Sequence, residues 1–357
     1  MRDFSSALYL GLRHAASTLR PWAQLTTGVP SALEQAPEAG RLARRLAALG
    51  GCESALLAPS TLHLFWDLPA LLGPRASVLV ESGSYAIGRW GAERAAGAGT
   101  PVRTFAHHDP AALRRALLSC PAGRRPLVIA DGLTPAEGPG PLAAYAELIA
   151  RYGGRLLIDD TQALGILGTS PDARTPYGHG GGGSLRFHGV QDPHVLVIAS
   201  LAKGFGAPLA LLAGAHEQVR RFAAASETRV HCSPPSTAAL RAGESALTVN
   251  RMRGEQLRAR LLRLVRLFRA GVERLGLRCS GGQFPVQALA PMPQALVAAL
   301  QAELLRRGVR AVAQRHGRTR ARVCFLLSAR HSRADVEHAL DALAGARPLL
   351  AQARLAA

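Results

Sequence analysis

Lysine is almost absent from this sequence. Lys203 is the single lysine among 43 lysine and arginine residues, so all the others are arginines. On a solvated surface either cation serves, and arginine can take the place of lysine there. Arginine cannot serve where chemistry needs an amine that loses its proton, because the guanidinium stays charged in proteins. Lys203 is therefore either a chance survivor or a residue whose chemistry arginine cannot supply.

Cysteine pairs and long apolar runs are also missing. The five cysteines are odd in number and show no CxxC spacing, so neither a disulfide framework nor a zinc site is expected. No stretch is apolar over a membrane-spanning length, and the first residues carry no apolar run ending in a cleavage signal. We expect a cytoplasmic protein without a membrane partner.

Aromatic residues make up only 5% of the chain, while the formal net charge is +19. The arginines are dispersed, as in residues 251–274, where they alternate with an apolar stripe typical of an amphipathic helix. Basic residues are not interleaved with aromatic ones, so a nucleic-acid partner is not expected. The charge favours small anionic partners instead, such as phosphorylated cofactors and coenzyme A esters.

Short apolar runs alternate with helical patterns over the first two thirds of the chain. The expected strands are Ser77–Glu81, Val102–Ala106, Pro126–Ala130, Arg155–Asp159, Val195–Ser200 and Leu209–Gly214. This alternation predicts an α/β fold with a mainly parallel central sheet and helices on both faces. A long helical region, Ser236–Leu275, leads into a smaller C-terminal α+β domain. We expect an N-terminal segment (1–30), a large α/β domain (31–240), and the long helix with the small domain (241–357).

The segment 178–183 (GHGGGG) matches the GxGxxG spacing of dinucleotide-binding proteins. That motif binds a dinucleotide only where it follows a strand and opens a helix. Here it follows prolines and does neither, so we interpret it as a flexible loop.

Three features that can carry chemistry fall at the ends of expected strands. Asp159 and Asp160 end one strand, and Asp160 is the better candidate for capping a turn or helix. Lys203 follows another strand in a glycine-rich turn, and Ser60–Thr61 opens a helix whose N-terminus can bind a phosphate. In a parallel sheet such features gather at one edge. A lysine for an imine, a carboxylate for a pyridine nitrogen and a phosphate site are what pyridoxal phosphate (PLP) requires.

At these residues the chain resembles the fold-type I PLP-dependent enzymes, members of aminotransferase class I/II, and among them the α-oxoamine synthases. The matching segments run nearly from end to end: Phe4–Leu12 (FSSALYLGL), Phe105–Asp109 (FAHHD), Ile158–Gly165 (IDDTQALG), Ser200–Gly206 (SLAKGFG) and His231–Pro235 (HCSPP). The aspartate and lysine segments are typical of fold type I, and the terminal segments of the α-oxoamine synthases.

The resemblance implies a role for each matching residue. Lys203 would form the imine with the cofactor, and Asp159 would pair with the pyridine nitrogen. The resemblance also implies that Gln162 lies near the phenolic oxygen of the cofactor, that Tyr85 stacks on its ring and that Thr134 lines the ring. The residues implied at the phosphate are Ser200, Thr61 and Leu62, and Ser233 would reach the phosphate bound in the neighbouring subunit. Arg315 would bind the substrate carboxylate, and a homodimer is implied. Arg315 has a plain alternative as one more surface arginine.

Departures from the family pattern bear on the reaction more than on the cofactor. Tyr85 and Gln162 stand where the family has histidines, and Ala7 replaces an asparagine. The resemblance implies condensation of an amino acid with an acyl thioester such as acyl-CoA, with decarboxylation, to an α-amino ketone. Transamination or another reaction at Cα is the first alternative. A non-catalytic partner subunit is the second, and the presence of Lys203 speaks against it.

Overall fold

The computed structural model describes residues 1–73 and 75–350. Contacts divide the chain into two compact units. The larger unit contains residues 13–134 and 139–254, and the smaller contains residues 1–12, 135–138 and those from 255 onward.

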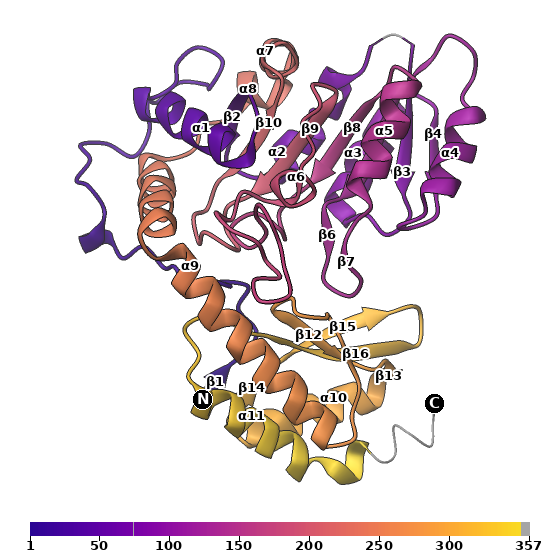
Figure 1. Cartoon of the computed structure of the whole chain (residues 1–357). Helices are drawn as coiled ribbons and strands as arrows, with labels where there is room; N and C mark the ends of the chain where they lie inside the picture. The colour runs from indigo at the N-terminus through magenta and orange to yellow at the C-terminus, as the bar shows by residue number, and fades with distance from the viewer. Residues whose placement is uncertain (74, 351–357) are drawn as a thin grey trace. The chain divides into compact units, whose positions relative to one another are not determined.

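A seven-stranded sheet forms the centre of the larger unit (Figure 1). In spatial order its strands are β2 (Ser54–Ala58), β10 (Ala210–Gly214), β9 (Val195–Ser200), β8 (Arg155–Asp159), β5 (Arg125–Asp131), β3 (Ala76–Glu81) and β4 (Val102–Phe105). All pairings from β9 to β4 are parallel, and β10 runs antiparallel to both of its neighbours. The prediction of a mainly parallel α/β sheet is confirmed.

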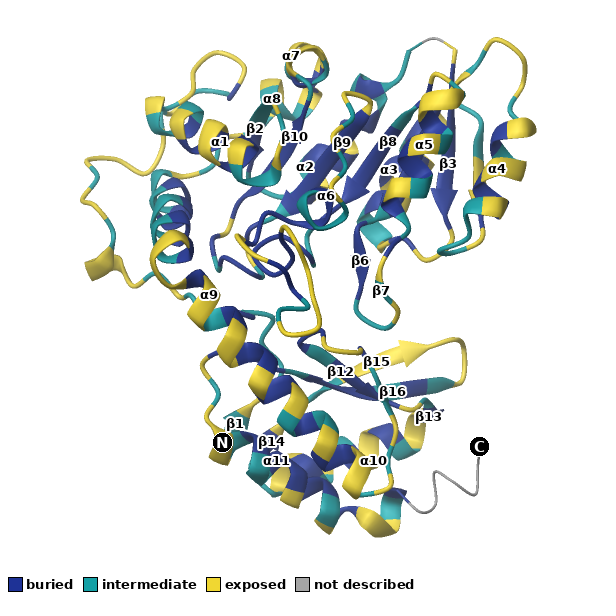
Figure 2. Ribbon diagram, viewed as in Figure 1, coloured by how far each residue is buried: buried dark blue, intermediate teal, exposed yellow. Residues whose placement is uncertain are grey.

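The strands form because their residues are apolar on both faces, as a covered parallel sheet requires. All six residues of β3 and all five of β10 are buried, and Figure 2 shows the central strands in the buried colour. Alternate residues of the strands share one apolar cluster with residues of α2 (Thr61–Trp66), α3 (Ala86–Gly97) and α7 (His216–Ala225). The residues between them are equally buried, on the face where Figure 1 shows α1 and α5.

Short connections and the remaining helices complete the larger unit. The helices are α1 (Pro37–Gly50), α4 (Pro110–Leu118), α5 (Leu142–Arg151), α6 (Ser184–His188), α8 (Glu227–His231), and the 3-10 turns η1 (Ala16–Thr18) and η2 (Leu68–Leu71). A two-stranded ribbon pairs β6 (Leu133–Thr134) with β7 (Gly138–Pro139), and residues 135–138 of this ribbon belong to the smaller unit. Asp109 caps α4 by accepting a hydrogen bond from the Ala112 N–H, with Pro110 as the first helical residue.

The smaller unit is an α+β structure built from both ends of the chain. Its sheet contains β11 (Cys279–Ser280), β12 (Val286–Leu289), β13 (Met292–Pro293), β15 (Val312–His316) and β16 (Arg320–Leu326), with α10 (Gln294–Arg306) and α11 (Arg333–Gly345) beside it. A separate parallel pair joins β1 (Arg2–Asp3) to β14 (Val309–Arg310). The fully buried Phe4 ring stacks on His331, with centroids 4.2 Å apart, and this contact fixes the N-terminal residues to the unit.

The two units divide the chain differently from the expected ranges 1–30, 31–240 and 241–357. Residues 1–12 join the smaller unit, because β1 pairs with β14, and the next residues join the larger one. The second boundary lies at 254/255, inside the 38-residue helix α9 (Thr237–Arg274). The sequence could not place it there, because the helical pattern continues unbroken across it.

Three glycines of 178–183, namely Gly178, Gly182 and Gly183, pack against other segments. A Cβ at Gly182 would lie 2.3 Å from the Leu49 carbonyl oxygen, and Gly183, at φ +93°, lies against the Asp160 carboxylate. Isolated bridges join this segment to Leu164 and Thr169. The interpretation of a flexible loop therefore needs correction: these glycines allow close packing.

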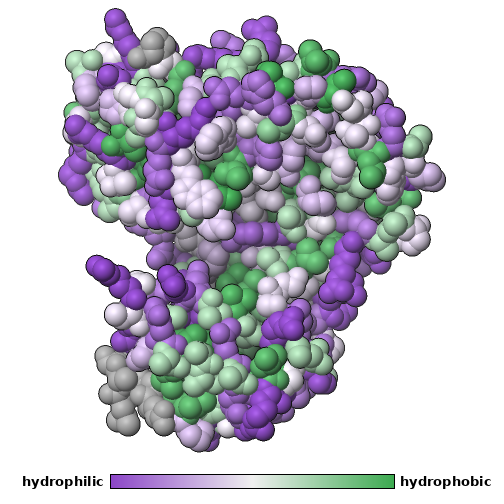
Figure 3. All heavy atoms as spheres, turned by 180° about the vertical axis from the view of Figure 1, so that it is seen from behind, coloured by the Kyte–Doolittle hydropathy of each residue, from purple (hydrophilic) through white to green (hydrophobic). Residues whose placement is uncertain are grey.

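Hydrophilic side chains are spread across the face of the molecule seen in Figure 3, in agreement with the dispersed arginines of the sequence. No helix among the residues described is both long enough and apolar enough to cross a membrane.

Candidate active site

Lys203 lies in the turn that follows β9. The strand ends at Ser200, and the chain returns through residues 201–209 to β10, so the lysine stands at the carboxyl edge of the sheet. Burial lowers the pKa of the Lys203 amine, while the nearby carboxylates of Asp159 and Asp131 raise it. Desolvation is the larger effect, which favours an amine that can lose its proton.

Asp159 is the last residue of β8 and is only 7% exposed. Its carboxylate accepts a hydrogen bond from the Thr161 N–H at 3.0 Å. Burial raises the pKa of Asp159, whereas the Thr161 hydrogen bonds and the charge of Lys203 lower it. The strand end thus brings the predicted carboxylate and the predicted lysine into electrostatic contact.

Asp160 points elsewhere. Its carboxylate accepts hydrogen bonds from the Ser184 N–H, at the start of α6, at 3.0 and 3.2 Å. Burial raises the pKa of Asp160 to about 7. The interpretation of Asp160 as a capping residue agrees with these contacts.

Asp131 is a site residue that the sequence interpretation missed. It ends β5 and pairs in register with Asp159 on β8. Its two carboxylate oxygens accept hydrogen bonds from the Tyr85 N–H at 3.1 and 3.3 Å. Burial and the charge of Asp159 raise the pKa of Asp131 to about 8. The available signal was its place directly after an expected buried strand, the same signal that singled out Asp159.

Tyr85 presents its ring to the lysine. The Lys203 Nζ lies 5.8 Å from the centre of the ring. Tyr85 precedes α3, and 58% of the residue is exposed. An exposed aromatic ring beside a buried amine is suited to stack on a planar heterocycle.

The other predicted contacts lie on several elements. Ser200 ends β9; its N–H donates to Thr161 Oγ1 at 3.0 Å, and its Oγ accepts from the Ala202 N–H at 3.2 Å. Thr134 is buried in β6, and its hydroxyl has no hydrogen-bond partner among the described residues. Gln162 is half-buried in the turn after β8.

The remaining residues are farther along the chain or in the other unit. Thr61 and Leu62 are the first two residues of α2, directly after β2 and Ser60. Ser233 is exposed between α8 and α9, and Arg315 is exposed on β15 of the smaller unit. Among the described residues, Asp159 and Tyr85 of the predicted set act on or lie near Lys203, and the roles of all the predicted residues stay predictions.

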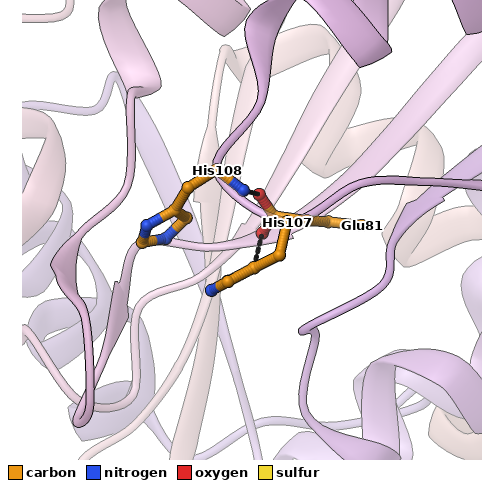
Figure 4. A group of neighbouring side chains, drawn as sticks. All are labelled: Glu81, His107 and His108. Carbon is orange, nitrogen blue, oxygen red and sulfur yellow. Dashed lines mark hydrogen bonds and ion pairs between the residues drawn. The ribbon is translucent and has the colours of Figure 1, made fainter.

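A cluster of Glu81, His107 and His108 lies at the end of β3 (Figure 4). The fully buried Glu81 accepts hydrogen bonds from the Tyr145 hydroxyl at 2.6 Å and the His108 N–H at 2.8 Å on one oxygen. Its other oxygen lies 3.3 Å from His107 Nδ1. Ligand atoms of the three side chains are close enough to hold one ion. One Glu81 oxygen accepts both hydrogen bonds and the other only lies near His107, so we interpret the cluster as an anchor for the loop after β4.

Comparison with known proteins gives the family and the fold. Residues 68–343 match the family model described as aminotransferase class I and II. The 8-amino-7-oxononanoate synthase of Halorhodospira halophila is 31% identical over 320 residues, 87% of this chain and 75% of that protein. The enzyme of the same name from Marinobacter nauticus is 32% identical over 71% of this chain, which spans 62% of that relative's length. A high-resolution structure of SPT (serine palmitoyltransferase) with PLP has a TM-score of 0.86 at 16% identity, over 97% of this chain and 87% of that one.

Proposed function

Since the chain belongs to the aminotransferase class I and II family, and within it to the α-oxoamine synthases, we infer that it condenses an amino acid with an acyl thioester. Carbon dioxide and a thiol would leave, and the product would be an α-amino ketone. The observation that carries this function is the half-buried Lys203, whose amine feels the charge of Asp159 and lies 5.8 Å from the centre of the Tyr85 ring.

The residues present fit PLP. A primary amine, a buried carboxylate and an aromatic ring at one strand edge are the donor set that this cofactor uses. When bound, PLP supplies an electron sink for the charge that develops at Cα of the amino acid. Asp159 would hold a proton on the ring nitrogen, and Tyr85 would cover one face of the ring.

Lys203 would act twice. Its amine would hold the carbonyl carbon of the cofactor until the amino acid takes its place. The freed amine would then accept the proton from Cα, a role that its lowered pKa favours. The predicted phosphate contacts of Thr61, Leu62, Ser200 and Ser233, the ring contacts of Gln162 and Thr134, and the carboxylate contact of Arg315 are part of the same proposal.

The reaction is tested by release of free thiol. The purified protein with PLP is titrated with each amino acid in turn, and any amino acid that changes the visible spectrum is then offered with acyl-CoA donors. Thiol release that needs both substrates supports the condensation. An amino acid that changes the spectrum and exchanges its amino group with a 2-oxo acid, without thiol release from any donor, would instead indicate transamination.

Tyr85 gives a first prediction about cofactor binding. Tyr85→Ala is expected to weaken PLP binding by about tenfold, because an aromatic stacking contact contributes about 0.5–1.5 kcal/mol. Tyr85→Phe keeps the ring and is expected to bind within about twofold of the unsubstituted chain. Equilibrium dialysis measures both. Equal losses in the two variants would assign the effect to the hydroxyl and contradict a stacking role.

We also propose a homodimer. Large apolar side chains are about half exposed on neighbouring elements of the larger unit: Leu62 and Trp66 on α2, Trp90 on α3 and Val230 on α8. Grouped exposed apolar residues on a folded chain are typical of an interface.

The location we propose is the cytoplasm, because the five cysteines remain thiols.

Trp90→Asp tests the interface. A buried, unpaired carboxylate at this surface would disfavour association, so the variant is expected to sediment as a monomer at low micromolar concentration, where the unsubstituted chain sediments as a dimer. Leu118→Asp, at an exposed apolar position on α4, is the matched control and should remain dimeric. Sedimentation velocity separates the two species. A dimeric Trp90→Asp protein would place the interface on another surface.

A further inference from the structure

A cavity of about 560 Å³ lies at the amino edge of the seven-stranded sheet, next to α7 (Figure 1). Its lining includes Ala76, Arg125 and Arg155, which are the first residues of β3, β5 and β8. Lys203 and Asp159 stand at the opposite, carboxyl edge. Because β8 runs from Arg155 to Asp159, the Cα atoms of these two residues are about 13 Å apart. The cavity is therefore separate from the candidate active site.

The lining of this cavity is strongly basic. It contains four arginines, Arg75, Arg125, Arg155 and Arg221, and among the described residues of the lining Glu217 is the one acid. The positive charges of the arginines thus outnumber the negative ones by three. All of these residues belong to the larger unit, so the cavity is complete within it.

The register of the sheet explains why two of these arginines meet. Arg155 on β8 pairs with Leu127 on β5, and Arg125 lies two residues before Leu127 on the same strand. Paired residues, and residues two apart on one strand, project their side chains from the same face, so both arginines lie on the face of Leu127. Leu127 shares its apolar cluster with Phe222 of α7, the helix that carries Arg221. Three elements therefore place arginines on one side of the sheet edge.

Two of the guanidinium groups are held by backbone carbonyls. Arg155 is half-buried and donates to the Leu71 carbonyl oxygen. Arg221 donates to the Leu72 carbonyl oxygen at 3.4 Å. Burial lowers the pKa of Arg155, and the charges of Arg221 and Arg125 lower it further. The arginines are thus close enough to repel one another, and an anion bound among them would relieve this repulsion.

We propose that this cavity is a second binding site, which takes a small anion that carries a diphosphate group. Planar guanidinium forks match the oxygens of phosphate, and the volume lies within the range of small-molecule sites. A single phosphate group carries about 1.5–2 negative charges near pH 7, so two such groups are needed to balance three positive charges.

The test is calorimetric titration of the protein with inorganic pyrophosphate. The protein is loaded with PLP and unbound PLP is removed, so that the phosphate position of the cofactor is filled and pyrophosphate reports on another site. We expect one pyrophosphate to bind per chain, about tenfold or more tightly than inorganic phosphate, because the second phosphate adds charge-assisted contacts. Equal affinity for the two ions would overturn the proposal, and so would the absence of pyrophosphate binding at millimolar concentration.

Arg125→Gln and Arg221→Gln each remove one guanidinium from an exposed side chain of the lining. Each is expected to weaken pyrophosphate binding by about tenfold, the effect of one charge-assisted contact. Arg114→Gln is the matched control, because it removes an exposed arginine of α4 outside the lining and changes the net charge equally. Its affinity should stay within about twofold of the unsubstituted chain, since distant exposed charges are screened.

Circular dichroism shows whether each variant keeps the fold, and either lining variant is sufficient for the test. Unchanged affinity in a folded lining variant contradicts the proposal. Equal losses in the control and the lining variants would show a general attraction by the net charge, and the proposal would fail.

ADP distinguishes the two forms in which a diphosphate can occur. ADP that displaces pyrophosphate and binds more tightly would support a diphosphate carried by an organic group, which the apolar lining residues Leu72, Pro126 and Pro193 can contact. Tighter binding of pyrophosphate would support the free ion. The site is independent of the proposed function. A protein that releases thiol but binds no pyrophosphate would overturn this inference alone, and one that binds pyrophosphate without thiol release would overturn the function alone.

Discussion

Lys203→Ala is expected to abolish the visible absorbance of bound PLP and to lower kcat/KM by about 10⁴-fold or more, as removal of a covalent nucleophile does in other enzymes. The chain has no second lysine to replace it. Borohydride reduction of the unsubstituted protein should fix the cofactor to the peptide that contains Lys203. Peptide mapping of the alanine variant should show no such product.

Lys203→Arg distinguishes the role of the lysine amine as a nucleophile from the role of its positive charge. Arginine keeps a cation near Asp159 and Asp131 but stays protonated, so this variant should be as inactive as alanine. Activity in the arginine variant above a tenth of that of the unsubstituted chain would show that only the charge matters, and the proposed chemistry would then fail.

Asp159→Asn is expected to lower kcat by about 10²–10³-fold, the cost typical of removing one preorganised electrostatic contact. Asparagine has the same shape and still offers an oxygen to the Thr161 N–H, so the fold should be retained. What it lacks is the negative charge that holds a proton on the pyridine nitrogen. Steady-state kinetics with the substrates identified by thiol release, together with circular dichroism of the fold, measure the two effects.

Asp160, the residue next to Asp159, provides a variant for comparison. Asp160→Ala removes both oxygens that accept from the Ser184 N–H at the start of α6 and leaves the contacts of Asp159 in place. We expect a lower thermal midpoint and a kcat within about fivefold of the unsubstituted chain, since loss of a helix cap costs about 0.5–2 kcal/mol of stability. Equal losses of kcat in both variants would mean that the carboxylates act together, contrary to the separate roles assigned to them.

The sequence was most informative where strand pattern and chemistry coincided. Lys203 and Asp159 each follow a buried run, and parallel strands bring their carboxyl ends to one edge. The contact between them was therefore predictable from topology. Asp131 has the same position after β5, but a single carboxylate after a strand has no motif of its own, and its partner Tyr85 N–H is 46 residues away. Only the folded structure brings those two residues together.

The boundary between the two units and the packing of the glycine segment could also not be predicted from the sequence. A helix pattern states that residues are helical but not which half of the helix packs on which core, so the boundary inside α9 had no signal in the sequence. A run of glycines is compatible with mobility and with close packing. A Cβ at Gly182 would lie 2.3 Å from the carbonyl oxygen of Leu49, which is distant in sequence. This close contact shows that the segment is packed at Gly182.

The pairing of β1 with β14 has a consequence for the order of events on the ribosome. Arg2 meets Val309, so β1 waits for a partner that is made about 300 residues later. At 5–20 residues per second this delay lasts about 15–60 s. During that time the Phe4 ring, which ends fully buried against His331, has no native surface to cover it. The larger unit can complete its synthesis and begin to fold before the smaller one closes, and until then β1 and Phe4 stay without their native contacts.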